Sequence, residues 1–439
     1  MGVQYWPRVA PVIFRGLNMI GKSLWALAAI GLGLLSDVPA LAQDIAPPPP
    51  IMVPPVGRSM GSIVHLAVSA QEGDISDQSQ LGEIYLSGRG IARDSATGLK
   101  WLQKAASQGS AVAQVQLGVT YLFDQGGLRD YAQAERWLRE AANHGDGTGQ
   151  YFLGRMYDEG LGVAADYVQA YKWMALAVLS HDGLSEANQY LRHRNQVEAK
   201  LTPAQLLDAK KLVAAWKAAP ATPDQLVITG EAAYDAGDTA TALKILTPLA
   251  TDGHPLAQYL MGQIYQFGGD ATKDDAVAAD WYRKAAAQGQ PGAQLFLGML
   301  YILGSGVPQD DIRATGWFRK SAEQGVGMAQ FMLGMAYLGS SGAPHDDAMA
   351  AVWFERAARQ GDGDAQYQLA KLYAEGRGVA QDNIQAYKWA YLARDYIEDS
   401  QRRNAAAHEM SAIGAQLLSS EYVEADRLIK AFQPVFEIP

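Results

Sequence analysis

Hydrophobic residues recur along most of this chain with a period of 36 residues. Each period contains two segments with apolar residues at helical spacing, joined by a loop that contains glycine. In one unit the first segment covers residues 292–301, the loop covers 304–307, and the second segment runs from Asp310 to Gly325. Such a period is typical of solenoids, because each helix pair buries its apolar face against the next pair. The pattern therefore predicts an all-α fold, an α-solenoid of helix-turn-helix repeats.

The same residue types occupy equivalent positions in successive units. An aspartate precedes each second helix, where its carboxylate can accept hydrogen bonds from the first backbone N–H groups. A glycine follows that helix, where a left-handed conformation is expected. A tryptophan lies three residues after a small residue, and we expect it to fill the layer between helices. The tryptophans are Trp101, Trp137 and Trp173, and, after a break, Trp281, Trp317, Trp353 and Trp389.

Two short motifs recur within these units. Ala-Gln-x-x-(Leu/Met)-Gly-x-x-Tyr occurs at residues 113–121, 257–265, 293–301 and 329–337, and Lys-Ala-Ala-x-Gln-Gly occurs at 104–109 and 284–289. The motifs resemble those of the Sel1-like repeat family, a relative of the tetratricopeptide repeat, in its exported bacterial type. The resemblance extends over about residues 61–434. It implies a right-handed-type solenoid that acts by binding other proteins.

The repeats divide into two arrays. The first array is expected over residues 61–217 and the second over residues 225–434, with a joint at 218–224 that contains Pro220 and Pro223. Residues 61–73 are expected to form a lone second helix at the start of the first array. Each array ends in a longer helical segment, since Leu201 and Leu417 are 216 residues apart, six times 36. These segments are interpreted as caps that cover the exposed stacking face.

The N-terminal segment has the pattern of a secretory signal peptide. Its apolar run, residues 24–35, has 12 residues, which is short of the roughly 20 that a membrane-spanning helix needs. Arg15 and Lys22 precede the run and Ala40-Leu41-Ala42 follows it. We therefore predict a signal peptide over residues 1–42, with Met19 as an alternative start. A proline-rich linker over 43–60 follows. The protein is then periplasmic or secreted, with no membrane span after cleavage; an uncleaved anchor helix is the alternative.

The composition of the chain excludes several kinds of partner and of catalytic site. Lys and Arg total 36 and Asp and Glu total 46, a net charge of −10, which disfavours nucleic acid as a partner. The absence of cysteine excludes thiol nucleophiles and disulfides. Residues 16–23 match a phosphate-loop pattern and residues 57–61 match G-x-S-x-G, but neither lies in the α/β context that its chemistry requires. We expect no cofactor, no metal site and no catalytic residues, and hence no enzyme.

Partner binding is expected at variable positions of the first helix of each unit. In the second array these positions carry large apolar side chains that could line a groove for a peptide or helix. The alternative is that they pack between neighbouring helices. The residues are Leu260, Phe296, Met299, Met332 and Met335.

The resemblance implies an exported scaffold or adaptor for protein–protein interaction, whose partners would be envelope proteins or peptides. Regulation of envelope signalling or assembly is one role of this kind. A glycan-binding structural component of a cell-envelope or polysaccharide-export complex is an alternative. A cell-wall or β-lactam-acting enzyme is disfavoured, because the relatives labelled in that way carry paired cysteines that this chain lacks. The sequence does not determine the oligomeric state.

Overall fold

The computed structural model describes residues 60–123, 127–180, 185–268, 273–339, 342–397 and 399–438. Within these ranges the chain forms 21 α-helices, labelled α2 to α22, and no strand. The predicted all-α repeat fold is therefore confirmed. The predicted signal peptide and nearly all of the proline-rich linker lie outside the described residues. Among the described helices, none is both long enough and apolar enough to cross a membrane.

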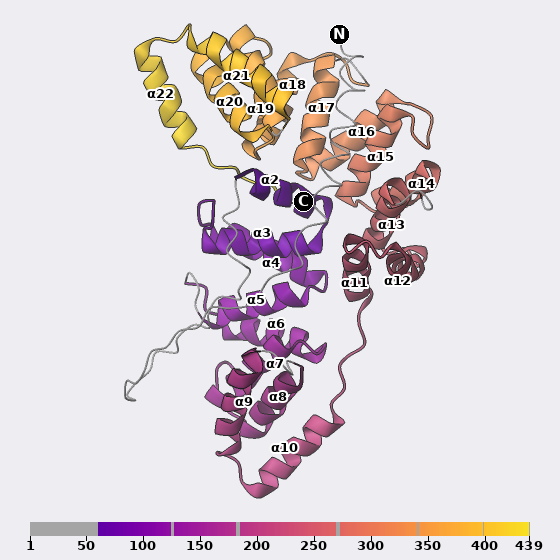
Figure 1. Cartoon of the computed structure of the whole chain (residues 1–439), viewed down its shortest axis with the longest axis vertical. Helices are drawn as coiled ribbons and strands as arrows, with labels where there is room; N and C mark the ends of the chain where they lie inside the picture. The colour runs from indigo at the N-terminus through magenta and orange to yellow at the C-terminus, as the bar shows by residue number, and fades with distance from the viewer. Residues whose placement is uncertain are drawn as a thin grey trace.

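The first array begins with a single helix, continues with three helix pairs and ends in two further helices (Figure 1). Neighbouring pairs stack directly on one another along the chain. The helices are α2 (Met60–Glu72), α3 (Ile75–Ser87), α4 (Ser95–Ser107), α5 (Ala111–Leu122), α6 (Tyr131–Asn143), α7 (Gly147–Glu159), α8 (Tyr167–Ser180), α9 (Ser185–Glu198) and α10 (Pro203–Ala215).

The second array resumes at Pro223 and consists of five helix pairs followed by two helices. Its bounds are α11 (Pro223–Asp235), α12 (Thr239–Thr251), α13 (Pro255–Phe267), α14 (Asp275–Ala287), α15 (Pro291–Leu303), α16 (Asp311–Glu323), α17 (Gly327–Gly339), α18 (Asp347–Arg359), α19 (Gly363–Glu375), α20 (Asn383–Tyr396), α21 (Ser400–Gly414) and α22 (Ser419–Lys430).

The predicted helix boundaries follow from side-chain and backbone hydrogen bonds. Asp94 accepts a hydrogen bond from the Thr97 backbone N–H at 3.1 Å, and the other six predicted aspartates cap their helices in the same way: Asp130, Asp166, Asp274, Asp310, Asp346 and Asp382. The glycine after the helix is left-handed, as at Gly325, whose φ is 96°. Capping by the aspartates is thus confirmed.

Glycine in the first helix of a repeat permits close helix packing. A Cβ atom on Gly298 would lie 2.6 Å from Cε1 of Phe318 and 3.2 Å from the carbonyl oxygen of Ala314, both on α16. The two helices can therefore approach this closely only because residue 298 lacks a side chain. The cost of a glycine in a helix, about 1 kcal/mol relative to alanine, is offset by this packing.

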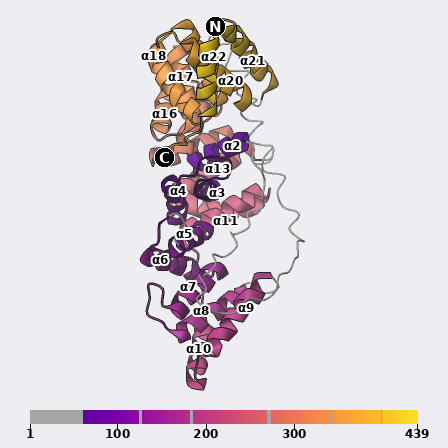
Figure 2. The same cartoon turned by 90° about the vertical axis from the view of Figure 1, so that its left-hand side faces the viewer.

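The two arrays pack against each other. The chain from α10 returns alongside the first array, and the second array then curves over α2 (Figures 1 and 2). The main hydrophobic core includes Leu102 and Leu117 of the first array together with Val227 and Leu246 of the second. The Ala219 backbone N–H donates to the Asn143 carbonyl at 2.8 Å, which ties the joint to the end of α6. The arrays consequently share one core at their junction.

Candidate functional site

The side chains predicted to line an open groove lie in the core instead. Leu260, Phe296 and Met332 are each 2% exposed, Met299 is 4% exposed, and Met335 is partly buried against the same core. The Phe296 ring stacks on Tyr282 with centroids 5.6 Å apart. These residues were expected to be exposed in a groove, and that expectation is wrong. They pack between neighbouring helices, as the alternative had it.

The reason for this burial is the position of the first helix of each pair. α15 packs against α14 and α16 along the array, and α2 of the first array contacts it as well. Every residue of α15 from Gly292 to Ile302 is buried as a result. A helix enclosed in this way presents no free face, so variable positions on it do not report a binding surface.

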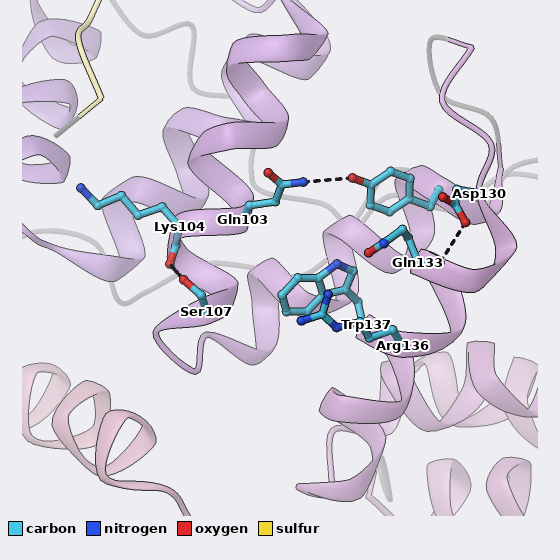
Figure 3. A pocket seen from close by; sticks show the side chains of 8 residues that line it. Gln103, Lys104, Ser107, Asp130, Gln133, Arg136 and Trp137 are labelled. Carbon is cyan, nitrogen blue, oxygen red and sulfur yellow. Dashed lines mark hydrogen bonds between the residues drawn. The ribbon is translucent and has the colours of Figure 1, made fainter.

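Two hollows lie against second helices of the first array. A hollow of about 670 Å³ is formed by α4, α6 and Tyr121 of α5 (Figure 3). A second hollow of about 600 Å³ lies between α4 and the C-terminal residues Phe436 to Ile438, and Gln103 lines both. We call these two hollows the α4–α6 channel. Its lining residues are Thr97, Lys100, Gln103, Lys104, Ser107, Tyr121, Asp130, Gln133, Arg136, Trp137, Phe436, Glu437 and Ile438.

The channel walls are positioned by contacts within and between repeats. The Gln103 side-chain amide donates to the Tyr121 hydroxyl at 3.1 Å, which joins α4 to the next helix (Figure 3). Asp130 accepts from the Gln133 backbone N–H at 3.0 Å and so begins α6. The Arg136 guanidinium lies 4.8 Å from the Trp137 ring centroid. The aromatic and charged groups are thus held by regular helices.

The charge of the channel differs from that of the whole chain. Lys100, Lys104 and Arg136 line it, against Asp130 and Glu437, although the chain carries a net charge of −10. Burial lowers the pKa of Lys104 to about 8. The combination of Trp, Tyr and Arg with a polar rim is typical of surfaces that contact protein segments.

Nothing in the described chain assembles a metal centre: these residues contain no group of three or more His, Cys, Asp and Glu side chains placed to hold an ion. One histidine, His193, contacts a tyrosine and not a metal-binding group. His193 Nδ1 lies within hydrogen-bonding distance of the Tyr151 hydroxyl, and the two rings stack with centroids 5.5 Å apart. This pair ties the capping helix α9 to α7.

A buried glutamine ladder was missed by the sequence analysis. In each repeat, the glutamine of the Ala-Gln motif donates to a carbonyl eight residues earlier, as Gln294 does to Ala286 at 3.2 Å. The glutamine that follows the second helix then donates to the first, as Gln324 does to Gln294 at 2.8 Å. Equivalent pairs are Gln108 with Gln78, Gln288 with Gln258 and Gln360 with Gln330. The signal was present in the sequence as Ala-Gln and Gln-Gly at a 36-residue period.

Glu72 occupies the ladder position at the end of α2, since it lies 36 residues before Gln108. It is buried against the second array, and the Tyr259 hydroxyl donates to its Oε2 at 3.4 Å. Burial raises the pKa of Glu72 to about 8. The Glu72 carboxyl group therefore takes the place of a ladder glutamine where the first array contacts the second.

Comparisons with known proteins agree with the repeat geometry. The family model described as "Sel1 repeat" matches residues 76–110, 111–146, 148–181, 255–290, 291–326, 327–362 and 363–395. A search of curated proteins found no match.

Two solved structures are among those similar to this chain. A Sel1 repeat protein from Oxalobacter formigenes has 26% identity and a TM-score of 0.41, over 80% of this chain and 94% of its own. The c5321 protein, a protective antigen of uropathogenic Escherichia coli strains that displays an SLR fold, has 25% identity and a TM-score of 0.34, over 84% and 94%.

Proposed function

Because this chain belongs to the Sel1 repeat family, whose repeats generally form protein-interaction scaffolds, we propose that it is an exported scaffold that binds other proteins through the α4–α6 channel. The observation that carries the proposal is the channel itself. Its larger hollow places Trp137, Tyr121 and Arg136 beside amide and carboxylate groups of two successive repeats.

The chemistry of the channel favours an acidic protein segment. Lys100 is exposed, Lys104 is half-buried, and Arg136 is exposed beside the Trp137 ring. These cations attract carboxylates, and the ring and the Arg136 guanidinium offer contact area of the kind that dominates protein interfaces. We therefore expect a partner that contributes aromatic or aliphatic side chains together with carboxylates.

Export is the second part of the proposal. It rests on the signal-like residues 1–42, with the apolar run 24–35 and the Ala40-Leu41-Ala42 motif. The scaffold would then act in the periplasm or outside the cell, on envelope proteins of a signalling or assembly system. Fractionation of cells that express the protein natively should recover a chain beginning at Gln43 outside the cytoplasm.

The binding surface is tested by photo-crosslinking in those cells. A crosslinking amino acid at Gln133, inside the channel, should capture a small set of envelope proteins. The matched control is the same substitution at Arg313, which occupies the equivalent repeat position 180 residues later. Equal capture from both positions would contradict the assignment to the channel. Capture of cell-wall material alone would contradict protein binding and favour a glycan-binding component.

A further inference from the structure

After α22 the chain leaves the end of the second array and contacts the first array. Residues 434–438 are extended and lie between the first array and the second. We call this stretch the tail segment. Pro434 and Phe436 are buried and Val435 between them is 64% exposed, so these three side chains point alternately toward and away from the protein. This alternation is the pattern of an extended peptide on a surface.

The first anchor of the tail segment is Phe436. Its side chain is 3% exposed and joins a hydrophobic cluster of the first array that includes Ile63, Leu81 and Trp101. The ring meets Tyr85 edge-on with centroids 6.4 Å apart, and the Phe436 backbone N–H donates to the Tyr85 hydroxyl at 3.3 Å. An aromatic side chain thus fills a pocket made by α2, α3 and α4.

The second anchor is Glu437, which turns to the opposite side. Both of its carboxylate oxygens contact Arg356 of α18, with Nε to Oε1 at 3.1 Å and Nη2 to Oε2 at 2.5 Å. The Gln330 amide adds a hydrogen bond to Oε2 at 3.2 Å. Bidentate pairing of arginine with carboxylate is both strong and specific in geometry.

The backbone of the tail segment is bound as well. The Val435 N–H donates to the Arg359 carbonyl at 2.9 Å, and the Glu437 N–H donates to Gln360 Oε1 at 3.0 Å. The Gln71 amide donates to the Glu437 carbonyl at 2.8 Å. Main-chain hydrogen bonds combined with pockets for particular side chains are how proteins recognise extended peptides.

The tail segment is held by contacts with residues far away in the sequence and is not part of a helix. α22 ends at Lys430, and Ala431 and Gln433 in the connection are exposed. The 600 Å³ hollow beside Phe436 and Ile438 is lined on its other side by Thr97, Lys100 and Gln103, and Gln103 also lines the 670 Å³ hollow of the α4–α6 channel. A longer peptide bound in the same place could therefore extend into that channel.

We propose that the tail segment is a tethered occupant of a peptide-binding site, and that this site takes an extended segment of a partner protein with a bulky apolar residue followed by a carboxylate residue. The site consists of the Phe436 pocket and Arg356, Gln330, Gln360 and Gln71. Binding of the partner requires release of residues 434–438. The inference rests on the proposed function and extends it, since this site adjoins the hollow of the α4–α6 channel that Phe436, Glu437 and Ile438 line.

The test uses the chain truncated after Gln433 and a fluorescent peptide with the sequence of residues 432–439. Fluorescence polarisation should show saturable binding of the peptide to the truncated chain. Binding to the full-length chain should be weaker by at least about tenfold, because the chain's own tail segment competes with the peptide. Peptides with Phe436→Ala or Glu437→Ala should bind at least about tenfold more weakly, as expected of interface anchors. The Val435→Ala peptide is the matched control and should bind like the parent, since that side chain is exposed.

A charge exchange tests the Arg356 contact. The truncated chain with Arg356→Glu should lose the parent peptide and regain binding with the Glu437→Arg peptide. A truncated chain that keeps its helical circular dichroism but does not bind the peptide would overturn the proposal. A truncated chain that loses its helical signal would also overturn it, because the segment would then be part of the fold.

Full-length protein provides an independent measurement. The Phe436→Ala/Glu437→Ala double variant should bind the peptide more tightly than the unchanged chain does. Light scattering that shows a dimer dissociated by removal of the segment would identify a second copy as the occupant and overturn the proposal. Capture from Gln133 in cells together with a failure of peptide binding would leave the proposed function standing and reject only this inference.

Discussion

The Tyr259 hydroxyl lies 3.4 Å from Oε2 of Glu72, although the two residues are 187 positions apart and belong to different arrays. Glu72 ends the first helix of the first array, and Tyr259 lies on α13 of the second. Burial raises the pKa values of the neighbouring Asp74 and Glu231, and it raises the pKa of Asp235 to about 6. The junction between the arrays therefore holds several carboxyl groups that bind a proton more tightly than an exposed carboxyl group does.

This cluster predicts a dependence of stability on pH. A carboxyl with a raised pKa binds its proton more tightly in the folded chain than in the unfolded chain, so Glu72 disfavours folding increasingly as the pH rises from 4.5 to about 8. Glu72→Gln should remove this loss. At pH 8.5 we expect the variant to be more stable than the parent by at least about 1.4 kcal/mol, the equivalent of one pKa unit. At pH 5 the two should differ little.

Urea unfolding at a series of pH values measures the effect. Glu323→Gln is the control, because Glu323 is exposed at the end of α16 and should leave the pH profile unchanged. Parallel profiles for the parent and Glu72→Gln would show that the Glu72 carboxyl does not couple proton binding to folding.

The close packing at Gly298 predicts a clear contrast between two glycines. Gly298→Ala should destabilise the chain by about 1–3 kcal/mol, because its Cβ would lie 2.6 Å from Phe318. Gly316→Ala, on the next helix, should be stabilising by about 0.5–1 kcal/mol, since a Cβ there meets no atom within 4 Å. Thermal or urea unfolding of both variants checks the sign of each change. Similar effects at both positions would contradict the packing argument.

The glutamine ladder predicts that its members differ in their contribution to stability. Gln294→Leu removes one of the two acceptors of the Gln324 amide and the side-chain donor to the Ala286 carbonyl, at an expected cost of about 1–3 kcal/mol. Gln366→Leu should cost less, because Gln366 Oε1 accepts no hydrogen bond within the described chain. Free energies of unfolding from urea titration distinguish the two. An equal cost would mean that the pairing between glutamines adds nothing beyond the backbone contact.

The channel predicts that charge controls partner binding. Arg136→Glu should reduce partner capture from Gln133 in cells and leave the helical circular dichroism unchanged, because Arg136 is exposed. Arg313→Glu, which reverses the charge of an exposed arginine on the second array, is the control and should have no effect on capture. If Arg136→Glu leaves capture in cells unchanged, the cationic wall of the channel is not part of the interface.

Much of the fold could be predicted from local patterns. Asp310 as a helix cap and Gly325 as a left-handed residue depend on hydrogen bonds within a few positions of the chain. The stacking of helix pairs follows from a repeat that meets only its neighbours. The exposure of the predicted binding positions was wrong, because the first helices that carry them are enclosed, whereas Gln103, Gln133 and Arg136 of the hollow lie on second helices.

The sequence by itself determined the helix pairs, their caps and the family of the repeats, because these features depend on residues close together in the chain or one repeat apart. Only the tertiary structure decided that Phe296 and Met332 are enclosed, that Glu72 meets Tyr259, and that Phe436 and Glu437 bridge the arrays. Small rotations between successive pairs add up along the second array until it closes over α2. Contacts made by that closure join residues up to 366 positions apart, as between Gln71 and Glu437. No periodic pattern in the sequence encodes such contacts, since each depends on the summed geometry of all the repeats between them.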